Sequence, residues 1–155
     1  MVMACQKGRL SEMTMSDWSH VERPIPVPSA LTQPFWDGAR EGRILFQHCQ
    51  SCGNWQHPPA PTCTNCVGVD LKFEPVEGKG TIYSYTIGFH GGDHRFAAAI
   101  PYAGIVVELD GAKGVLMAGN LLGAPSTEAH VGRRVEVIFE PLNRDITLPQ
   151  FKLAE

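Results

Sequence analysis

The chain has 155 residues, of which 43% are hydrophobic, and its formal net charge is −3 from 13 basic and 16 acidic residues. This length allows one compact domain or two small ones, and the hydrophobic content excludes wholesale disorder. Neither half of the sequence is basic, which argues against a broad electrostatic surface for nucleic acid, and no apolar run approaches the ~18 residues that span a bilayer.

The N-terminal part of the chain predicts an extended arm. Prolines alternate with apolar residues from Pro24 to Pro28, which favours an extended backbone. We expect residues 1–29 to form a flexible arm that is loosely held or lies across a partner or its own domain, with Cys5 as an ordinary thiol within it. Because residues 1–14 lack the continuous apolar core of a signal peptide, we expect a cytoplasmic location.

A short helix is predicted within residues 30–43. Thr32 can cap its start, and Gly42 can end it in a left-handed conformation. Phe35 lies on the apolar face of this helix, and Trp36 lies beside that face. We expect core burial for this aromatic pair, with a groove that faces a partner as the alternative.

Cysteines provide the strongest chemical signal. Two Cys-x2-Cys pairs, with ten residues between them, place two thiolates on each of two tight turns: Cys49, Cys52, Cys63 and Cys66. Such a set can wrap one zinc ion in a tetrahedron and leaves no position open for water or substrate. We therefore expect one structural zinc ion per chain in a ribbon at residues 44–76, whereas a redox dithiol, the main alternative, would need only one pair.

Residues beside the cysteines modify this expectation. Gly53 follows the first pair directly, as a knuckle turn prefers, but Val67 follows the second pair and Gly68 comes one place late. We therefore expect a slightly altered second turn. His48 and His57 flank the first pair, and since four sulfurs already fill the tetrahedron, we expect surface or supporting roles for both.

Residues 77–155 have the pattern of a small β barrel. The predicted strands are rich in β-branched and aromatic residues: Thr81–Ile87, Gly104–Leu109, Val115–Ala118, Val135–Phe139 and a last strand with Phe151 and Leu153. Asp110-Gly111 is a hairpin signal between the second and third of these, and residues 125–130 can form one helical turn. About five strands with one helical turn suit a closed barrel of the OB type, so the predicted fold is mostly β.

The loop after the first barrel strand is the most polar one. Asp93 and His94 could suggest acid–base chemistry, but adjacent residues usually point apart, and no serine or cysteine nucleophile is obviously paired with them. We expect His90, His94 and Arg95 to lie in a solvated loop, with contact to a ligand or protein as the open alternative.

Aromatic residues of the first barrel strand form a second candidate surface. Tyr83, Tyr85 and Phe89 share one strand face by period two, and in OB folds such residues stack on single-stranded nucleic acid. Nearby basic residues are few, which favours core packing or a protein contact. The candidate ligand or partner contacts are therefore aromatic and polar: Phe35, Trp36, Tyr85, Phe89, His90, His94 and Arg95.

Taken in order, these pieces resemble a family of zinc-ribbon/OB-fold proteins, formerly a domain of unknown function, that accompany thiolases and other acyl-CoA enzymes. The matching pieces lie between residues 34 and 151: Phe35-Trp36, Gly42-x2-Leu45, the two cysteine pairs, Pro58-Pro59, Gly80–Thr86, Tyr102–Leu109, Gly132–Val137 and Leu148-Pro149-x-Phe151. The resemblance implies an N-terminal helix, a rubredoxin-like zinc ribbon and a C-terminal OB-fold barrel. It also implies an accessory subunit that binds a thiolase-like, aldolase or hydratase enzyme and helps it handle acyl-CoA, in some relatives during steroid or aromatic degradation.

Three functions follow as hypotheses. The first is a noncatalytic acyl-CoA-associated subunit in a homo- or hetero-oligomer, without membrane attachment. The second is a module that binds single-stranded nucleic acid, because ribbons and OB folds both serve that role. The third is a self-sufficient enzyme that uses His90, Asp93 or His94.

Overall fold

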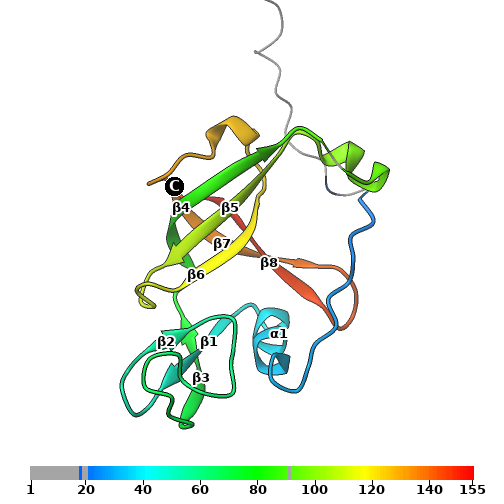
Figure 1. Cartoon of the computed structure of the whole chain (residues 1–155). Helices are drawn as coiled ribbons and strands as arrows, with labels where there is room; N and C mark the ends of the chain where they lie inside the picture. The colour runs from blue at the N-terminus through cyan, green and yellow to red at the C-terminus, as the bar shows by residue number, and fades with distance from the viewer. Residues whose placement is uncertain (1–17, 19–20, 91) are drawn as a thin grey trace, which may run out of the picture.

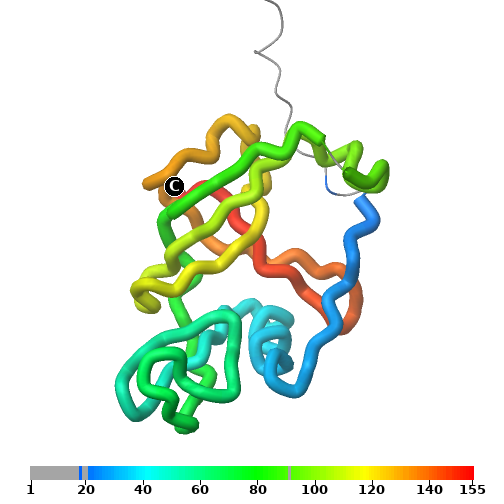
Figure 2. The backbone as a smooth tube through the Cα atoms, viewed as in Figure 1, coloured from blue at the N-terminus to red at the C-terminus, as the bar shows by residue number. Residues whose placement is uncertain are grey.

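The computed structural model describes residues 18, 21–90 and 92–155, and these form a helix, a small three-stranded sheet and a closed five-stranded barrel (Figures 1 and 2). Cys5 lies outside the described residues. The elements follow in chain order: α1 Gln33–Arg40, β1 Ile44–Cys49, β2 Trp55–Gln56, β3 Leu71–Val76, β4 Lys79–Gly88, the 3₁₀ helix η1 His94–Ala99, β5 Tyr102–Leu109, β6 Leu116–Leu121, the 3₁₀ helix η2 Ser126–Glu128, β7 Arg134–Pro141 and β8 Thr147–Leu153. The mostly β fold, with a leading helix, a ribbon and an OB-type barrel, is confirmed.

Helix α1 begins differently from the prediction. The Thr32 side chain caps no helix N–H, because Thr32 already has helical dihedrals, and its hydroxyl oxygen instead accepts a hydrogen bond from the Ser29 N–H at 2.9 Å. Gly42 ends the turn at φ 74° as predicted. Phe35 and Ala39 are buried on one face, which packs against β1 and the barrel strands β7 and β8.

The ribbon sheet has the strand order β2-β1-β3, and both strand pairs are antiparallel. Its central strand β1 carries two kinds of buried residue. Ile44 and Phe46 belong to the main hydrophobic core, whereas Cys49 ends the strand at the first cysteine turn. One short strand therefore connects the cysteine cluster to the core of the protein.

The barrel closes in the order β4-β5-β6-β8-β7, with β6 and β8 parallel and the other pairs antiparallel. Its interior follows the period of two expected for strands, since Ala103, Ile105, Val107 and Leu109 of β5 are all buried. One continuous cluster of buried side chains joins this interior to Phe35 and to the ribbon residues of β1. No described helix combines the length and the apolar character that a bilayer-spanning segment needs.

The described part of the N-terminal arm packs on the barrel. Trp18 and Val21 are buried together with Ala99 of η1, and the Arg23 guanidinium donates to the Glu140 carboxylate at 2.7 Å. From there the segment runs beside the barrel to α1 (Figure 2). Trp18, Val21 and Arg23 are thus held in place, whereas the sequence favoured a loosely held terminus.

The close approach of β4 and β5 generates a first prediction. A Cβ atom at Gly80 would lie 2.5 Å from the Glu108 carbonyl oxygen and 2.6 Å from a methyl group of Val107, whereas one at Gly104 would meet only Thr86 at 3.5 Å. Gly80→Ala should therefore lower the free energy of unfolding in urea by about 1–3 kcal/mol. The matched Gly104→Ala variant should stay near wild type, and equal losses in the two variants would contradict this packing.

Candidate functional site

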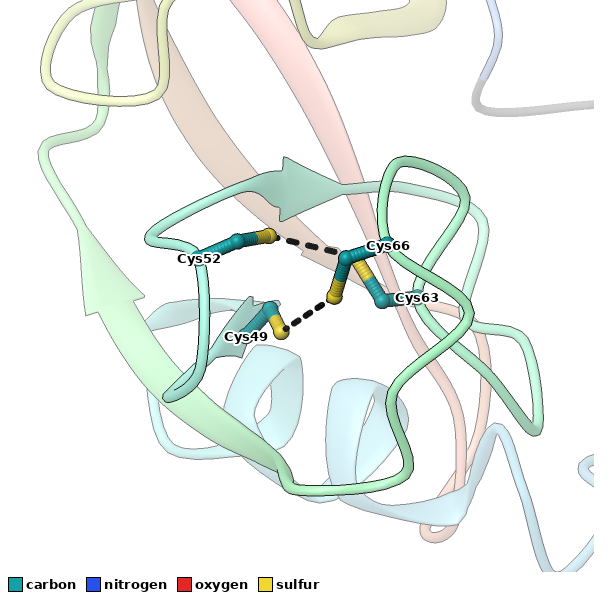
Figure 3. Close-up of side chains that lie close together, drawn as sticks. All are labelled: Cys49, Cys52, Cys63 and Cys66. Atoms are coloured by element: carbon teal, nitrogen blue, oxygen red, sulfur yellow. Dashed lines mark hydrogen bonds between the residues drawn. The ribbon is translucent and has the colours of Figure 1, made fainter.

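The four cysteines come together at one end of the ribbon. Their sulfur atoms all lie within 4.8 Å of one another, with 3.6 Å between Cys49 and Cys66 and 3.6 Å between Cys52 and Cys63 (Figure 3). A tetrahedral ion with sulfur ligands at about 2.3 Å requires sulfur–sulfur distances of about 3.8 Å. The donor set therefore fits a zinc-type ion, and these separations are far too long for disulfides.

The two cysteine turns are built alike. In the first, the Gly53 N–H donates to the Cys49 carbonyl at 2.9 Å, and in the second the Val67 N–H donates to the Cys63 carbonyl at 2.9 Å. The backbone is left-handed at the equivalent residues, with φ 71° at Gly53 and φ 61° at Val67. The expected alteration of the second turn is therefore wrong, because Val67 accepts the dihedrals of a glycine.

The four thiols lie close enough together to shift one another's protonation. Hydrogen bonds from the Cys66 and Asn65 backbone N–H groups lower the pKa of Cys63 to about 6. At Cys66 the Gly68 N–H acts in the same direction, but the neighbouring sulfurs outweigh it and raise the pKa to about 12. Four adjacent thiols cannot all ionise beside one another, whereas a bound dication allows each to be a thiolate.

The two histidines near the first turn do not contribute to the sulfur cluster. His48 stacks on Trp55 with ring centroids 4.3 Å apart, and its Nδ1 lies 2.9 Å from a Glu74 carboxylate oxygen. His57 packs instead between aromatic rings, 4.9 Å from Phe35 and 4.6 Å from Phe46. Burial lowers the pKa of His57 to about 4, so its imidazole is neutral at pH 7.

A cavity of about 300 Å³ lies where α1, the ribbon loop and the barrel meet. Its lining residues come from α1 and its cap, from the loop after β2, from β6 and from β8: Thr32, Phe35, Trp36, His57, Pro58, Pro59, Met117, Ala118, Leu148 and Pro149. Phe35 is 7% exposed and belongs to the core, while Trp36 is only partly buried. Sequence reasoning missed this cavity because no local pattern links segments so far apart.

A β-bulge changes the aromatic face expected on β4. The pairing of β4 with β5 shifts between Ile82 and Ser84, so that Tyr83 is an extra residue and Tyr85 lies opposite Ile105. Residues opposite each other share a face, so Tyr85 faces the same side of the sheet as Ile105, although the residue remains 41% exposed and its ring makes a T-shaped contact with His130. The expectation that Tyr83 and Tyr85 share one face is wrong for this reason.

Phe89 and the polar residues after it are exposed. Phe89 is 64% exposed at the end of β4, and His90 and the first residue of η1, His94, are exposed as well. Asp93 caps η1 and binds the Arg95 side chain at 2.8 Å, and these contacts lower the pKa of Asp93 to about 2. The aspartate is therefore an ionised partner of Arg95 and is poorly suited to proton transfer.

Comparisons with known proteins match both parts of this architecture. Residues 36–74 match the rubredoxin-like zinc ribbon domain of ChsH2, and residues 73–140 match the ChsH2 C-terminal OB-fold domain. The chain belongs to the ChsH2 family of proteins with a zinc ribbon and an OB-fold domain. The ribbon that carries the four cysteines is thus a rubredoxin-like zinc ribbon domain.

Two curated proteins are similar to the chain. One, from Thermomonospora curvata, carries the name "Probable enoyl-CoA hydratase alpha subunit" and is 28% identical over 99% of this chain and 49% of its own length. The other, from Mycobacterium tuberculosis, is named 3-oxo-4,17-pregnadiene-20-carboxyl-CoA hydratase alpha subunit and is 28% identical over 74% of this chain and 35% of its own length. The chain thus spans about half or less of the curated relatives that it matches.

Two solved structures share the fold. A chain of the Ltp2-ChsH2(DUF35) aldolase is 28% identical, with a TM-score of 0.74 over 84% of this chain and 99% of its own. A DUF35 family protein of unknown function from Sulfolobus solfataricus is 17% identical, with a TM-score of 0.59 over 81% of this chain and 87% of its own.

The left-handed Val67 generates a second prediction. A left-handed backbone costs a residue with a Cβ about 1–2 kcal/mol relative to the right-handed form, and Gly avoids this cost. Val67 is 72% exposed, so Val67→Gly removes little packing and should leave the zinc-loaded protein as stable as the wild type or slightly more stable in urea unfolding. The mirror change Gly53→Val should destabilise it, and a clear loss in Val67→Gly would show that the turn is not strained.

Proposed function

We propose that this protein is a noncatalytic accessory subunit that holds one structural zinc ion and supports a hydratase, aldolase or thiolase-like enzyme acting on acyl-CoA. The observation that carries the proposal is the set of four clustered sulfurs in a chain whose relatives are named as hydratase alpha subunits and as part of an aldolase. The similarity to a steroid-CoA hydratase subunit supports a role in the breakdown of steroids or comparable ring compounds.

The zinc ion in this proposal stabilises the fold and takes no part in chemistry. Cys49, Cys52, Cys63 and Cys66 supply four thiolates, which fill a tetrahedron and leave no position for a reactant. The ribbon sheet is small, since β2 has only two residues. Metal binding therefore contributes much of the free energy that holds the cysteine turns together.

The exposed polar loop gives little support to an independent enzyme. His94 Nδ1 lies 3.5 Å from an Asp93 carboxylate oxygen, but Asp93 is also paired with Arg95, and the His94 side chain is 96% exposed, so the pair is not desolvated. We therefore propose that catalysis resides in the partner and that this chain acts by binding to it. Reduced thiols at the metal site suit a cytoplasmic complex.

A nucleic-acid-binding module is the second candidate, because Tyr83 and Phe89 are exposed on a barrel of the OB type. The charges argue against it. Arg134 donates to Asp110, and Arg133 lies 3.4 Å from Glu128, so both arginines are already paired within the protein. The ribbon from Ile44 to Val69 has no Lys or Arg to contact phosphate.

The zinc proposal predicts that the purified protein contains about one zinc ion per chain by elemental analysis. Cys52→Ser should lose the ion and unfold the ribbon, because one of four ligands is removed, whereas the neighbouring Ser51→Ala should keep both. Acid should release the ion as well, since sulfur binds zinc only as the thiolate and protonation increases as the pH falls. Zinc-free protein with an intact ribbon would contradict this proposal.

The subunit proposal predicts stable association with a hydratase or aldolase polypeptide of the same organism. Co-expression of tagged protein with candidate partners, followed by size exclusion chromatography, should give a complex of defined stoichiometry, and enzyme turnover of acyl-CoA should depend on it. A protein that remains alone with every such partner, and that captures single-stranded DNA in a salt-dependent manner, would favour the nucleic-acid function instead.

A further inference from the structure

The cavity between α1, the ribbon loop and the barrel has the features of a ligand site. Four elements line it, and each contributes at least one side chain: Trp36 from α1, His57 from the ribbon loop, Ala118 from β6 and Pro149 from β8. Figure 1 shows α1 and the ribbon side by side below the barrel that contains β6 and β8. At about 300 Å³ the cavity lies at the lower end of the range found for small-molecule sites.

The chemistry of the lining excludes a charged ligand. None of its residues is Lys, Arg, Asp or Glu, and most are aromatic, aliphatic or proline. The hydroxyl of Thr32 is already engaged with Ser29, from which it accepts a hydrogen bond at 2.9 Å. The phosphates of a nucleotide need basic side chains or backbone N–H clusters, so they cannot be bound within these walls.

His57 is a lining side chain with unused polar atoms. Its ring is held between Phe35 and Phe46, and its nitrogens form no hydrogen bond with any described residue. Because the ring is partly buried and neutral, it offers one N–H donor and one acceptor. Apolar sites commonly contain a few polar groups that fix the orientation of the ligand.

We propose that this cavity binds the uncharged acyl end of a thioester, with the His57 N–H donating a hydrogen bond to a carbonyl oxygen of the ligand. The inference rests on the proposed function, since it specifies which part of an acyl-CoA this chain holds. The acyl group and the thioester lie among Trp36, Ala118 and Pro149, while the nucleotide remains outside the cavity.

The test uses octanoyl-N-acetylcysteamine, a neutral thioester without a nucleotide, and calorimetric titration of the full chain loaded with zinc. Ala118 is exposed on β6, so Ala118→Phe should fill the cavity without disturbing the core and weaken binding by at least about tenfold. The matched Ala97→Phe variant on η1 should bind as the wild type does. No binding to the wild type, or equal binding to both variants, overturns the proposal.

The His57→Phe variant tests whether His57 binds the ligand through its nitrogens or only supports the fold through its ring. Phe keeps the aromatic packing against Phe35 and Phe46 but removes both nitrogens, so affinity for the thioester should fall about three- to tenfold with little change in stability. Unchanged affinity would show that His57 donates no hydrogen bond to the ligand.

Association with the partner enzyme is measured on the same Ala118 and His57 variants. If the wild type does not bind the thioester but still associates with the partner enzyme, only the proposed ligand site is overturned. If the wild type binds the thioester but associates with no partner enzyme, the proposed function is contradicted and the proposed ligand site is retained.

Discussion

The arrangement of four sulfurs around a single point is the constraint on which the ribbon and its surroundings depend. Two cysteine turns, separated by ten residues, must meet although only a small sheet supports them. Neither turn has a hydrophobic core of its own, and Val67 holds a left-handed backbone. An ion that binds all four thiolates provides the attraction that apolar burial cannot provide in so small a unit.

The metal site and the cavity are physically connected. Strand β1 ends at Cys49 and carries Phe46, whose ring stacks on His57 at 4.6 Å. The loop that presents His57 continues to Cys63, so the two ends of this loop are fixed by the sheet and by the metal ligands. A firmly folded ribbon therefore positions one wall of the cavity, and Phe35 of α1 packs against the same His57 ring at 4.9 Å.

Local sequence patterns predicted much of the fold. The spacing of the cysteines, the hairpin glycine at Gly111 and the alternation in β5 each depend on neighbouring residues, and all three agree with the structure. The bulge at Tyr83 was not predictable in this way, because it arises from pairing with another strand. Neither was η1, a short 3₁₀ helix capped by Asp93 within the exposed loop.

The candidate ligand site was less accessible to sequence reasoning than the metal site. Metal ligands occur as two compact motifs, whereas the cavity combines Trp36, His57, Ala118 and Pro149 from four elements. Phe35 and Trp36 were recognised as an aromatic pair, but their burial differs only in three dimensions: both line the cavity, while Phe35 also belongs to the buried core and Trp36 is only partly buried. The neutral state of His57 depends on burial by distant rings and has no signature in its own neighbourhood.

X-ray absorption at the zinc edge of the purified protein tests the central claim most directly. The account predicts a first coordination shell of four sulfur atoms at about 2.3 Å, unchanged when an acyl thioester is added. An oxygen atom in that shell, or a shell that changes with the thioester, would show an ion with a position open to water or ligand and would contradict a purely structural role.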